Sequence, residues 1–117
     1  MMTLPPTVRV FLALEPADMR CAFDRLAHLV KDVIKENPLS GHLFCFRSRA
    51  SDRVKILWWS PGGYCLFYRR LEKGVFRFPN GQSQGKSVEI SARDLTMILE
   101  GIDLSAAKRR KEFVPAP

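Results

Sequence analysis

The sequence lacks any apolar run long enough to cross a membrane. No stretch approaches the roughly 20 apolar residues that a membrane-spanning helix needs. The first residues also lack the order of a secretory signal, in which a basic segment precedes an apolar run and small residues. We therefore expect a cytoplasmic protein that makes no membrane contact.

Cysteine and histidine are too few and too scattered to form a site. Cys21, Cys45 and Cys65 contain no C-x-x-C pair, and their odd number argues against a disulfide framework. Buried free thiols are the expected state of cysteines in a reducing compartment. His28 and His42 do not form a constellation, because His28 lies beside the apolar stripe of a predicted helix and His42 at the start of a predicted strand. The sequence therefore predicts neither a metal site nor a disulfide.

Catalytic motifs are missing as well. The chain has no glycine-rich phosphate loop and no G-x-S-x-G frame, and its aspartates and glutamates are spread along the chain. No acid, base or nucleophile can be assigned from spacing, and no cofactor motif is present. We therefore predict a protein that is not an enzyme and needs no cofactor.

The composition is that of a folded domain. The chain has 117 residues, of which 46% are hydrophobic and 26% charged, while proline and glycine together make only 15. These values are typical of a globular protein and lie outside the low-complexity range. At this length one domain with one real core is expected.

Positive charge is concentrated in the middle of the chain. The formal net charge is +7, yet residues 1–40 and 87–117 each balance five basic against five acidic side chains. Segment 41–86 carries nine basic side chains against Asp52 and Glu72, so the whole excess lies there. A local basic excess favours a polyanionic partner such as nucleic acid.

Several short segments rich in β-branched and aromatic residues predict strands separated by tight turns. The predicted strands are 7–14, 42–48, 54–60, 64–70, 75–78 and a short 88–90. Turn chemistry between them, such as Ser60-Pro61-Gly62-Gly63 and Lys73-Gly74, indicates an antiparallel meander.

Two helices complete the predicted fold. Apolar residues at three- and four-residue steps predict a helix over 17–36, with Phe23 and Leu26 on its core stripe. A shorter helix follows the capping pattern Ser91-Ala92-Arg93-Asp94 and closes at Gly101. The fold class is thus α+β, a single domain over 1–104 in which an antiparallel β-meander sheet packs against two helices, both on one face. The basic tail, 105–117, is predicted to be disordered.

Alternation along the predicted strands separates two faces of the sheet. One face carries Phe44, Phe46, Val54, Ile56 and Trp58, whereas the other mixes aromatic rings with arginine and lysine. Such mixing suits nucleic acid, because rings stack on bases while cations follow the phosphates. It also has a structural explanation, since aromatics favour strands and cations protect sheet edges. The candidate nucleic-acid-binding residues are Arg47, Arg49, Arg53, Lys55, Trp59, Tyr68, Arg69, Arg70 and Arg77.

Longer motifs carry a resemblance to a known family. The segments DMRCAFDRLAHLV (18–30), SGHLFCFRSRASDRVKILWW (40–59), GYCLFYRRLEKGVFRFP (63–79) and ILEGIDL (98–104) occur in order. They resemble the accessory proteins, called TnpB or second open reading frame products, of the bacterial insertion sequence family sixty-six. Because the resemblance spans roughly residues 7–104, it is far more specific than any single short motif.

The resemblance implies a helper of transposition encoded beside a larger, catalytic transposase. Two hypotheses then remain open. In the first, the protein binds nucleic acid, with transposon ends as the candidate DNA, through the basic aromatic surface of residues 41–86. In the second, it is an interaction module that docks on the transposase of the same element or self-associates without contacting DNA, since aromatics and arginine are also typical of interface centres.

Overall fold

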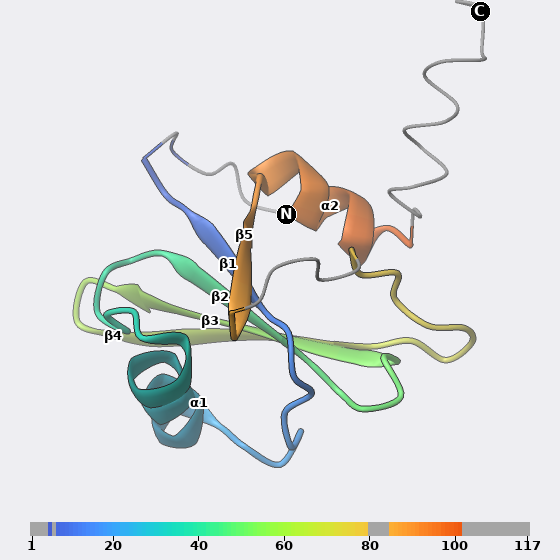
Figure 1. Ribbon diagram of the computed structural model, residues 1–117, viewed down its shortest axis with the longest axis horizontal. Coiled ribbons are helices and arrows are strands. Elements are labelled where there is room, and N and C mark those ends of the chain that lie inside the picture. Colours follow the sequence, from blue (N-terminus) through green and yellow to red (C-terminus); the bar gives the residue numbers. More distant parts are fainter. Residues whose placement is uncertain (1–4, 6, 80–84, 102–117) are drawn as a thin grey trace, which may run out of the picture.

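A five-stranded sheet lies between helices in this computed structural model, which describes residues 5, 7–79 and 85–101 (Figure 1). The sheet order is β4-β3-β2-β1-β5. The elements are β1 (Val10–Ala13), α1 (Phe23–Leu29), the π-helical segment η1 (Val30–Ile34), β2 (Leu43–Arg47), β3 (Arg53–Ser60), β4 (Gly63–Arg70), β5 (Ser87–Ile90) and α2 (Ala92–Leu99). The α+β class predicted from the sequence is confirmed.

The sheet is mixed rather than wholly antiparallel. Strands β2, β3 and β4 form the expected antiparallel meander, and β5 pairs antiparallel with β1. Strand β1, however, runs parallel to β2. Parallel neighbours need a long crossover, usually helical, and the connection through α1 and η1 supplies it. The meander therefore makes up three of the five strands of the sheet.

The helices cover opposite faces of the sheet, so the expectation that both lie on one face is wrong (Figure 1). One cluster of buried side chains joins α1 and η1 to the sheet through Leu26, Val30, Phe44 and others. A second cluster joins α2 to the other face and includes Leu95. We name the two sides the α1 face and the α2 face. Because both are covered, the central strands have no open face.

The pairing of β2 with β3 corrects the predicted faces. Phe44 lies opposite Leu57 and Phe46 opposite Lys55, so the two phenylalanines lie on the α1 face. Val54 and Ile56 lie on the α2 face instead. The two strands differ by one residue from the expected alignment, and a shift of one residue exchanges the faces of a strand.

Two elements differ from their prediction, one in where it begins and one in whether it forms at all. Helix α1 begins at Phe23 rather than 17, because Asp18 forms a local turn in which its carboxylate accepts from the Arg20 backbone N–H at 2.9 Å. The segment 75–78 forms no strand. Phe76 is instead buried against the α2-face core, and its backbone N–H donates to the Ser51 carbonyl at 2.7 Å.

The start and end of α2 follow the sequence pattern. Ser91 caps the helix, and its hydroxyl accepts from the Asp94 backbone N–H at 3.0 Å. Gly101 follows the helix with a φ of 80°, a conformation that glycine adopts without strain. The predicted tail, 105–117, lies outside the described residues, as does most of the 79–86 loop.

The helical stripe gives a stability test. Leu26 is fully buried in the α1-face core, whereas Phe23 is 44% exposed, so the prediction that both are core residues is wrong for Phe23. Leu26→Ala should lower the free energy of unfolding by about 2 to 5 kcal/mol. Phe23→Ala should lower it by less than about 1 kcal/mol. Denaturant unfolding measures both, and equal losses would contradict this packing of α1.

The thiols should differ in reactivity. Complete burial raises the pKa of Cys45 to about 12, because the thiolate loses its solvation, while Cys65 is only half-buried. Brief alkylation of the folded protein, followed by peptide mass spectrometry, should modify Cys65 well before Cys45. Equal labelling of the two thiols would show that the core opens far more readily than the structure indicates.

Candidate nucleic-acid interface

Most of the central positive charge gathers at one end of the sheet. This end consists of the loop 48–52, the adjoining ends of strands β2, β3 and β4, and the segment 71–77, and we name it the arginine end. Two backbone hydrogen bonds hold it together. The Leu71 N–H donates to the Asp52 carbonyl at 2.8 Å, and the Phe76 N–H donates to the Ser51 carbonyl. Its basic residues are Arg47, Arg49, Arg53, Arg69, Arg70, Lys73 and Arg77.

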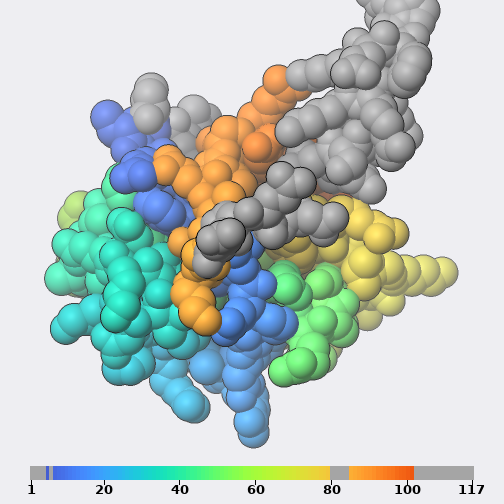
Figure 2. All heavy atoms as spheres, viewed as in Figure 1, coloured from blue at the N-terminus to red at the C-terminus, as the bar shows by residue number. Residues whose placement is uncertain are grey.

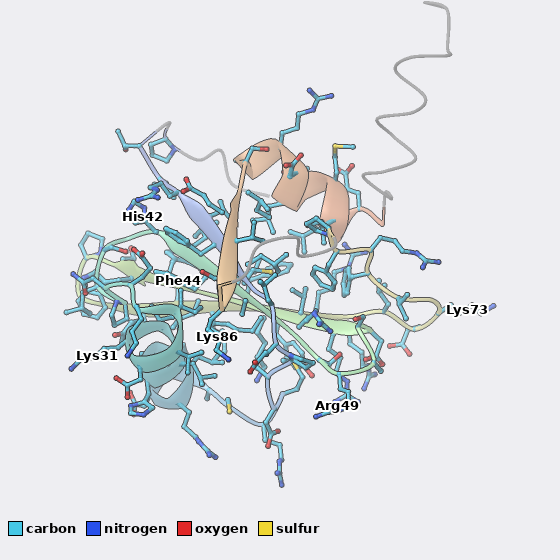
Figure 3. The ribbon with its side chains drawn as sticks, viewed as in Figure 1. Lys31, His42, Phe44, Arg49, Lys73 and Lys86 are labelled. Carbon is cyan, nitrogen blue, oxygen red and sulfur yellow. The ribbon has the colours of Figure 1, made fainter. Side chains whose placement is uncertain are left out.

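The figures show how this end is exposed. In Figure 2 the green atoms of the 48–52 loop lie beside the yellow atoms of the segment that follows β4. Figure 3 shows Arg49 and Lys73 projecting from this end, whereas Lys31 projects from the opposite one. Lys73 was not among the candidate site residues, although it belongs to the charge excess of segment 41–86. Only the fold shows that it joins the same end.

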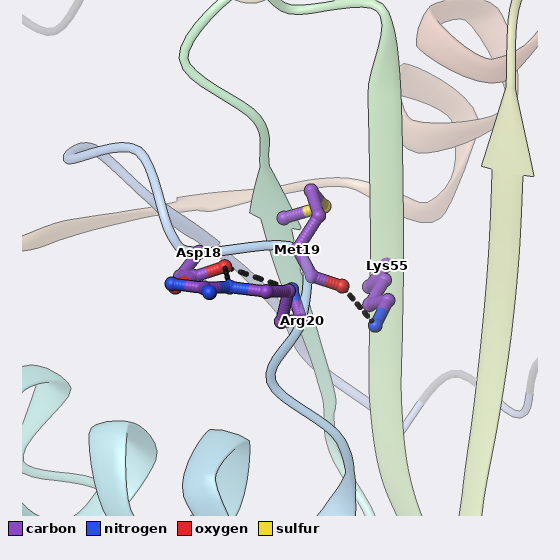
Figure 4. Close-up of polar contacts among 4 residues, drawn as sticks. All are labelled: Asp18, Met19, Arg20 and Lys55. Carbon is purple, nitrogen blue, oxygen red and sulfur yellow. Dashed lines mark hydrogen bonds and ion pairs between the residues drawn. The ribbon is translucent and has the colours of Figure 1, made fainter.

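Lys55 is a buried structural residue rather than an exposed cation. It is 6% exposed, and its Nζ donates to the Met19 carbonyl at 2.7 Å (Figure 4) and to the Cys21 carbonyl at 2.6 Å. These bonds fasten the segment that leads into α1 onto β3. Its ammonium is therefore committed to backbone oxygens, so Lys55 is not one of the exposed cations.

The segment that Lys55 holds is also shaped by a local ion pair. Arg20 Nη2 lies 2.8 Å from Asp18 Oδ2, and the same carboxylate accepts from the Arg20 backbone (Figure 4). These hydrogen bonds lower the pKa of Asp18 to about 2. Asp18 therefore stays ionised at a more acidic pH than an ordinary aspartate, and its carboxylate keeps the turn that presents the Met19 and Cys21 carbonyls to Lys55.

Two arginines of the arginine end also satisfy backbone carbonyls. Arg47 is half-buried, and its guanidinium donates to the Leu14 carbonyl at 2.9 Å. Arg69 donates to the Leu99 carbonyl at 2.6 Å, at the last residue of α2. A cation is favourable there because the C-terminal carbonyls of a helix carry partial negative charge. Arg69 remains exposed, so one nitrogen can bind α2 while the rest meets solvent.

Arg53 and Arg70 lie directly opposite each other across β3 and β4, on the α1 face. Like charges in this position repel one another and destabilise the pairing. Arg70 is partly compensated by Glu72, 3.1 Å away, in an exposed ion pair that contributes little to stability. An anion bound between the two guanidinium groups would relieve the repulsion.

Tyr68 lies next to this arginine pair on the same face, opposite Lys55. It is 48% exposed, and the Lys55 Nζ lies 4.7 Å from its ring centroid. A cation this close to the face of an aromatic ring is attracted to it, and this cation–π interaction stabilises the observed position of the Tyr68 ring. The ring is thus held in place while a large part of it stays accessible for stacking.

Trp59 lies far from Tyr68 along the sheet, and the two rings are not neighbours. It is half-buried and lies opposite Tyr64 near the β3–β4 turn. The two rings pack edge to face, with their centroids 5.0 Å apart. Tyr68 lies four residues from Tyr64 along β4, or about 13 Å. The two stacking candidates therefore do not form one platform.

Four cations of the arginine end make no side-chain hydrogen bond or ion pair with any described residue: Arg49, Arg53, Lys73 and Arg77. Of its two acidic residues, Asp52 accepts from the Ser48 hydroxyl at 3.0 Å and Glu72 pairs with Arg70. The positive charge of this end is therefore only partly neutralised within the described chain, and Arg49 and Arg77 are exposed.

Across the described ranges, no three His, Cys, Asp or Glu side chains come together as metal ligands would. The described helices also include none with the length and apolar character needed to span a membrane.

Comparison with known proteins places the chain in a class of accessory proteins of transposition. It belongs to the IS66 Orf2-like protein family, whose model matches residues 8–109, and this confirms the resemblance found in the sequence. The family is not known as a catalytic one. The chain is 44% identical over 96 residues to the protein y4hO of Sinorhizobium fredii, which covers 82% of each chain. It is 28% identical over 103 residues to y4jC of the same organism, which covers 88% of this chain and 86% of y4jC. No solved structure matches it.

The role of Lys55 can be tested by removing its charge. Lys55→Met should lower the free energy of unfolding by about 1 to 3 kcal/mol, because the Met19 and Cys21 carbonyls lose their donor. Lys31→Met, on the exposed side of η1, is the matched control and should have little effect. Urea unfolding measures both variants. A Lys55→Met protein as stable as the wild type would mean that these bonds do not hold the segment in place.

Proposed function

We propose that this accessory protein binds nucleic acid through the arginine end, with arginines on phosphates and Tyr68 on a base. The observation that carries the proposal is that Arg53 and Arg70 are directly opposed across β3 and β4, next to the exposed ring of Tyr68. Like charges directly opposite one another do not stabilise a strand pair, whereas a phosphate between the two guanidinium groups would be bound by charge-assisted hydrogen bonds.

The proposed interface is narrower than the candidate set from the sequence. Arg49, Arg53, Arg70, Lys73 and Arg77 are its phosphate-binding cations, and Tyr68 is its stacking ring. Arg47 and Lys55 support the fold from within, and Arg69 contributes mainly by fixing the end of α2. Trp59 lies too far along the sheet to share a base with Tyr68.

The proposed partners are the transposon ends as DNA and the transposase of the same element as protein. A compact cationic end beside one ring suits a site where duplex meets unpaired strand, because arginines donate to phosphates whatever the base sequence and the ring needs an unstacked base. The competing hypothesis is an interaction module that reaches DNA only through the transposase. It predicts no binding by the purified protein alone.

The salt dependence of binding tests the arginine end. If its five cations neutralise phosphates, the slope of log affinity against log salt on duplex DNA should be about −4.5. Arg53→Gln and Arg70→Gln should each reduce that slope by about 1. Arg25→Gln, which removes the same charge from the exposed side of α1, is the control and should leave the slope unchanged. Fluorescence anisotropy from about 50 to 200 mM salt measures it.

Two results of this experiment would contradict the proposal. One is a protein that binds no nucleic acid at about 50 mM salt, where the electrostatic contribution is large. The other is an Arg25→Gln variant that loses as much slope as Arg53→Gln, which would mean that charge acts without regard to position.

Tyr68 can be tested separately from the arginines. Tyr68→Ala should weaken binding to a single-stranded oligonucleotide by about 1 to 3 kcal/mol and leave the salt slope unchanged, because stacking releases no counterions. Tyr68→Phe keeps the ring and should bind like the wild type. Titrations against matched single-stranded and duplex DNA measure the difference. Equal affinities for Tyr68→Ala and Tyr68→Phe would exclude stacking at this position.

A further inference from the structure

Strand β4 has an unpaired outer edge. It spans eight residues, Gly63–Arg70, and pairs only with β3 within the described chain. An edge strand directs part of its backbone N–H and C=O groups outward, where another strand can pair with them. In Figure 1, β4 lies on the far side of the sheet from β5, the other edge.

The two edges of the sheet differ in their protection. Strand β5 has only four residues, and Glu89 on it forms an ion pair with Arg9 at 2.6 Å. Short length and charge both discourage pairing with another chain. From Tyr64 to Tyr68, β4 carries no charge, no proline and no glycine, and its side chains are aromatic, aliphatic or thiol. This edge has the length and composition of a pairing surface.

The charge pattern of β4 favours a second copy of the same strand in antiparallel orientation. Its cations, Arg69 and Arg70, lie together at one end. Parallel pairing would bring the arginines of two copies together, whereas antiparallel pairing sends them to opposite ends of the shared ladder. We infer that this protein dimerises by pairing the outer edges of two β4 strands antiparallel, with Phe67 of both copies on the two-fold axis.

The pleat of the strand fits this alignment. Residues opposite each other must point to the same face, so they must be separated by an even number of positions. With Phe67 on the axis, Tyr64 lies opposite Arg70 of the second copy, and Leu66 lies opposite Tyr68. A guanidinium beside an aromatic ring is a favourable contact. Cys65 comes to lie opposite Arg69 of the second copy.

The dimer would continue the sheet from one copy into the other. A two-fold axis perpendicular to the sheet keeps the α1 face of both copies on the same side. Both Arg53–Arg70 pairs would then face the same side of a joined sheet. The dimer itself requires no nucleic acid, so it can be tested, and can fail, independently of the proposed function.

Sedimentation of the full-length, nuclease-treated protein tests the inference. Over a range of concentrations, wild type should pass from the 13.4 kDa monomer to a species of twice that mass. Cys65→Lys should weaken the dimer by about tenfold or more, because it sets a lysine opposite Arg69 twice, once on each side of the axis. Val75→Lys adds the same charge at an exposed site outside the strands and should dimerise like wild type.

Hydrogen exchange of the unaltered protein gives a second measurement that does not depend on how a variant folds. Amides of Gly63–Arg70 should exchange more slowly at concentrations where the dimer forms, while those of β5 should not change. A protein that stays monomeric throughout would overturn the inference. So would a dimer that leaves exchange in β4 unchanged, or one that Val75→Lys weakens as much as Cys65→Lys does.

Discussion

Strand β2 is buried on both faces, and this constraint shapes the rest of the molecule. Leu43, Phe44, Cys45 and Phe46 are each at most 3% exposed, so successive residues enter two different cores. One helix must then cover each face, which α1 and α2 do. No broad open face remains on the central strands. Recognition is left to the ends and edges of the sheet, where the arginine end and β4 lie.

The basic residues of this chain serve two purposes that composition alone cannot separate. Arg47, Lys55 and Arg69 donate to the carbonyls of Leu14, Met19, Cys21 and Leu99, all outside the strand ladders. A buried carbonyl without a donor is costly, so these cations are part of the folding of the irregular segments and of α2. The positive charge that remains available to a partner therefore lies on fewer residues than the number of basic side chains in the sequence suggests.

The sequence predicted local features well. Each of these features depends on residues that are close together in the sequence. Periodicity predicts the strand positions, and side-chain chemistry predicts the Ser91 cap and the helix end at Gly101. The family, too, was evident from motifs that span most of the chain.

Features that depend on distant contacts were missed. Lys55 binds carbonyls 34 and 36 residues away, and nothing near Lys55 in the sequence indicates it. The segment 75–78 has the residues of a strand, yet Phe76 enters the α2-face core as irregular chain. The β2–β3 alignment, which decides the face of each aromatic ring, is set by the turn at 48–52 rather than by the strands themselves.

The most direct test of the central claim is an NMR titration of the ¹⁵N-labelled protein with a short single-stranded oligonucleotide at about 50 mM salt. If the arginine end binds phosphates and Tyr68 stacks on a base, amide shifts should change in residues 49–53, 68–73 and 77. Amides of β1, β5 and the exposed side of α1 should stay in place. Shifts confined to those other elements, or no shifts at all, would contradict the account.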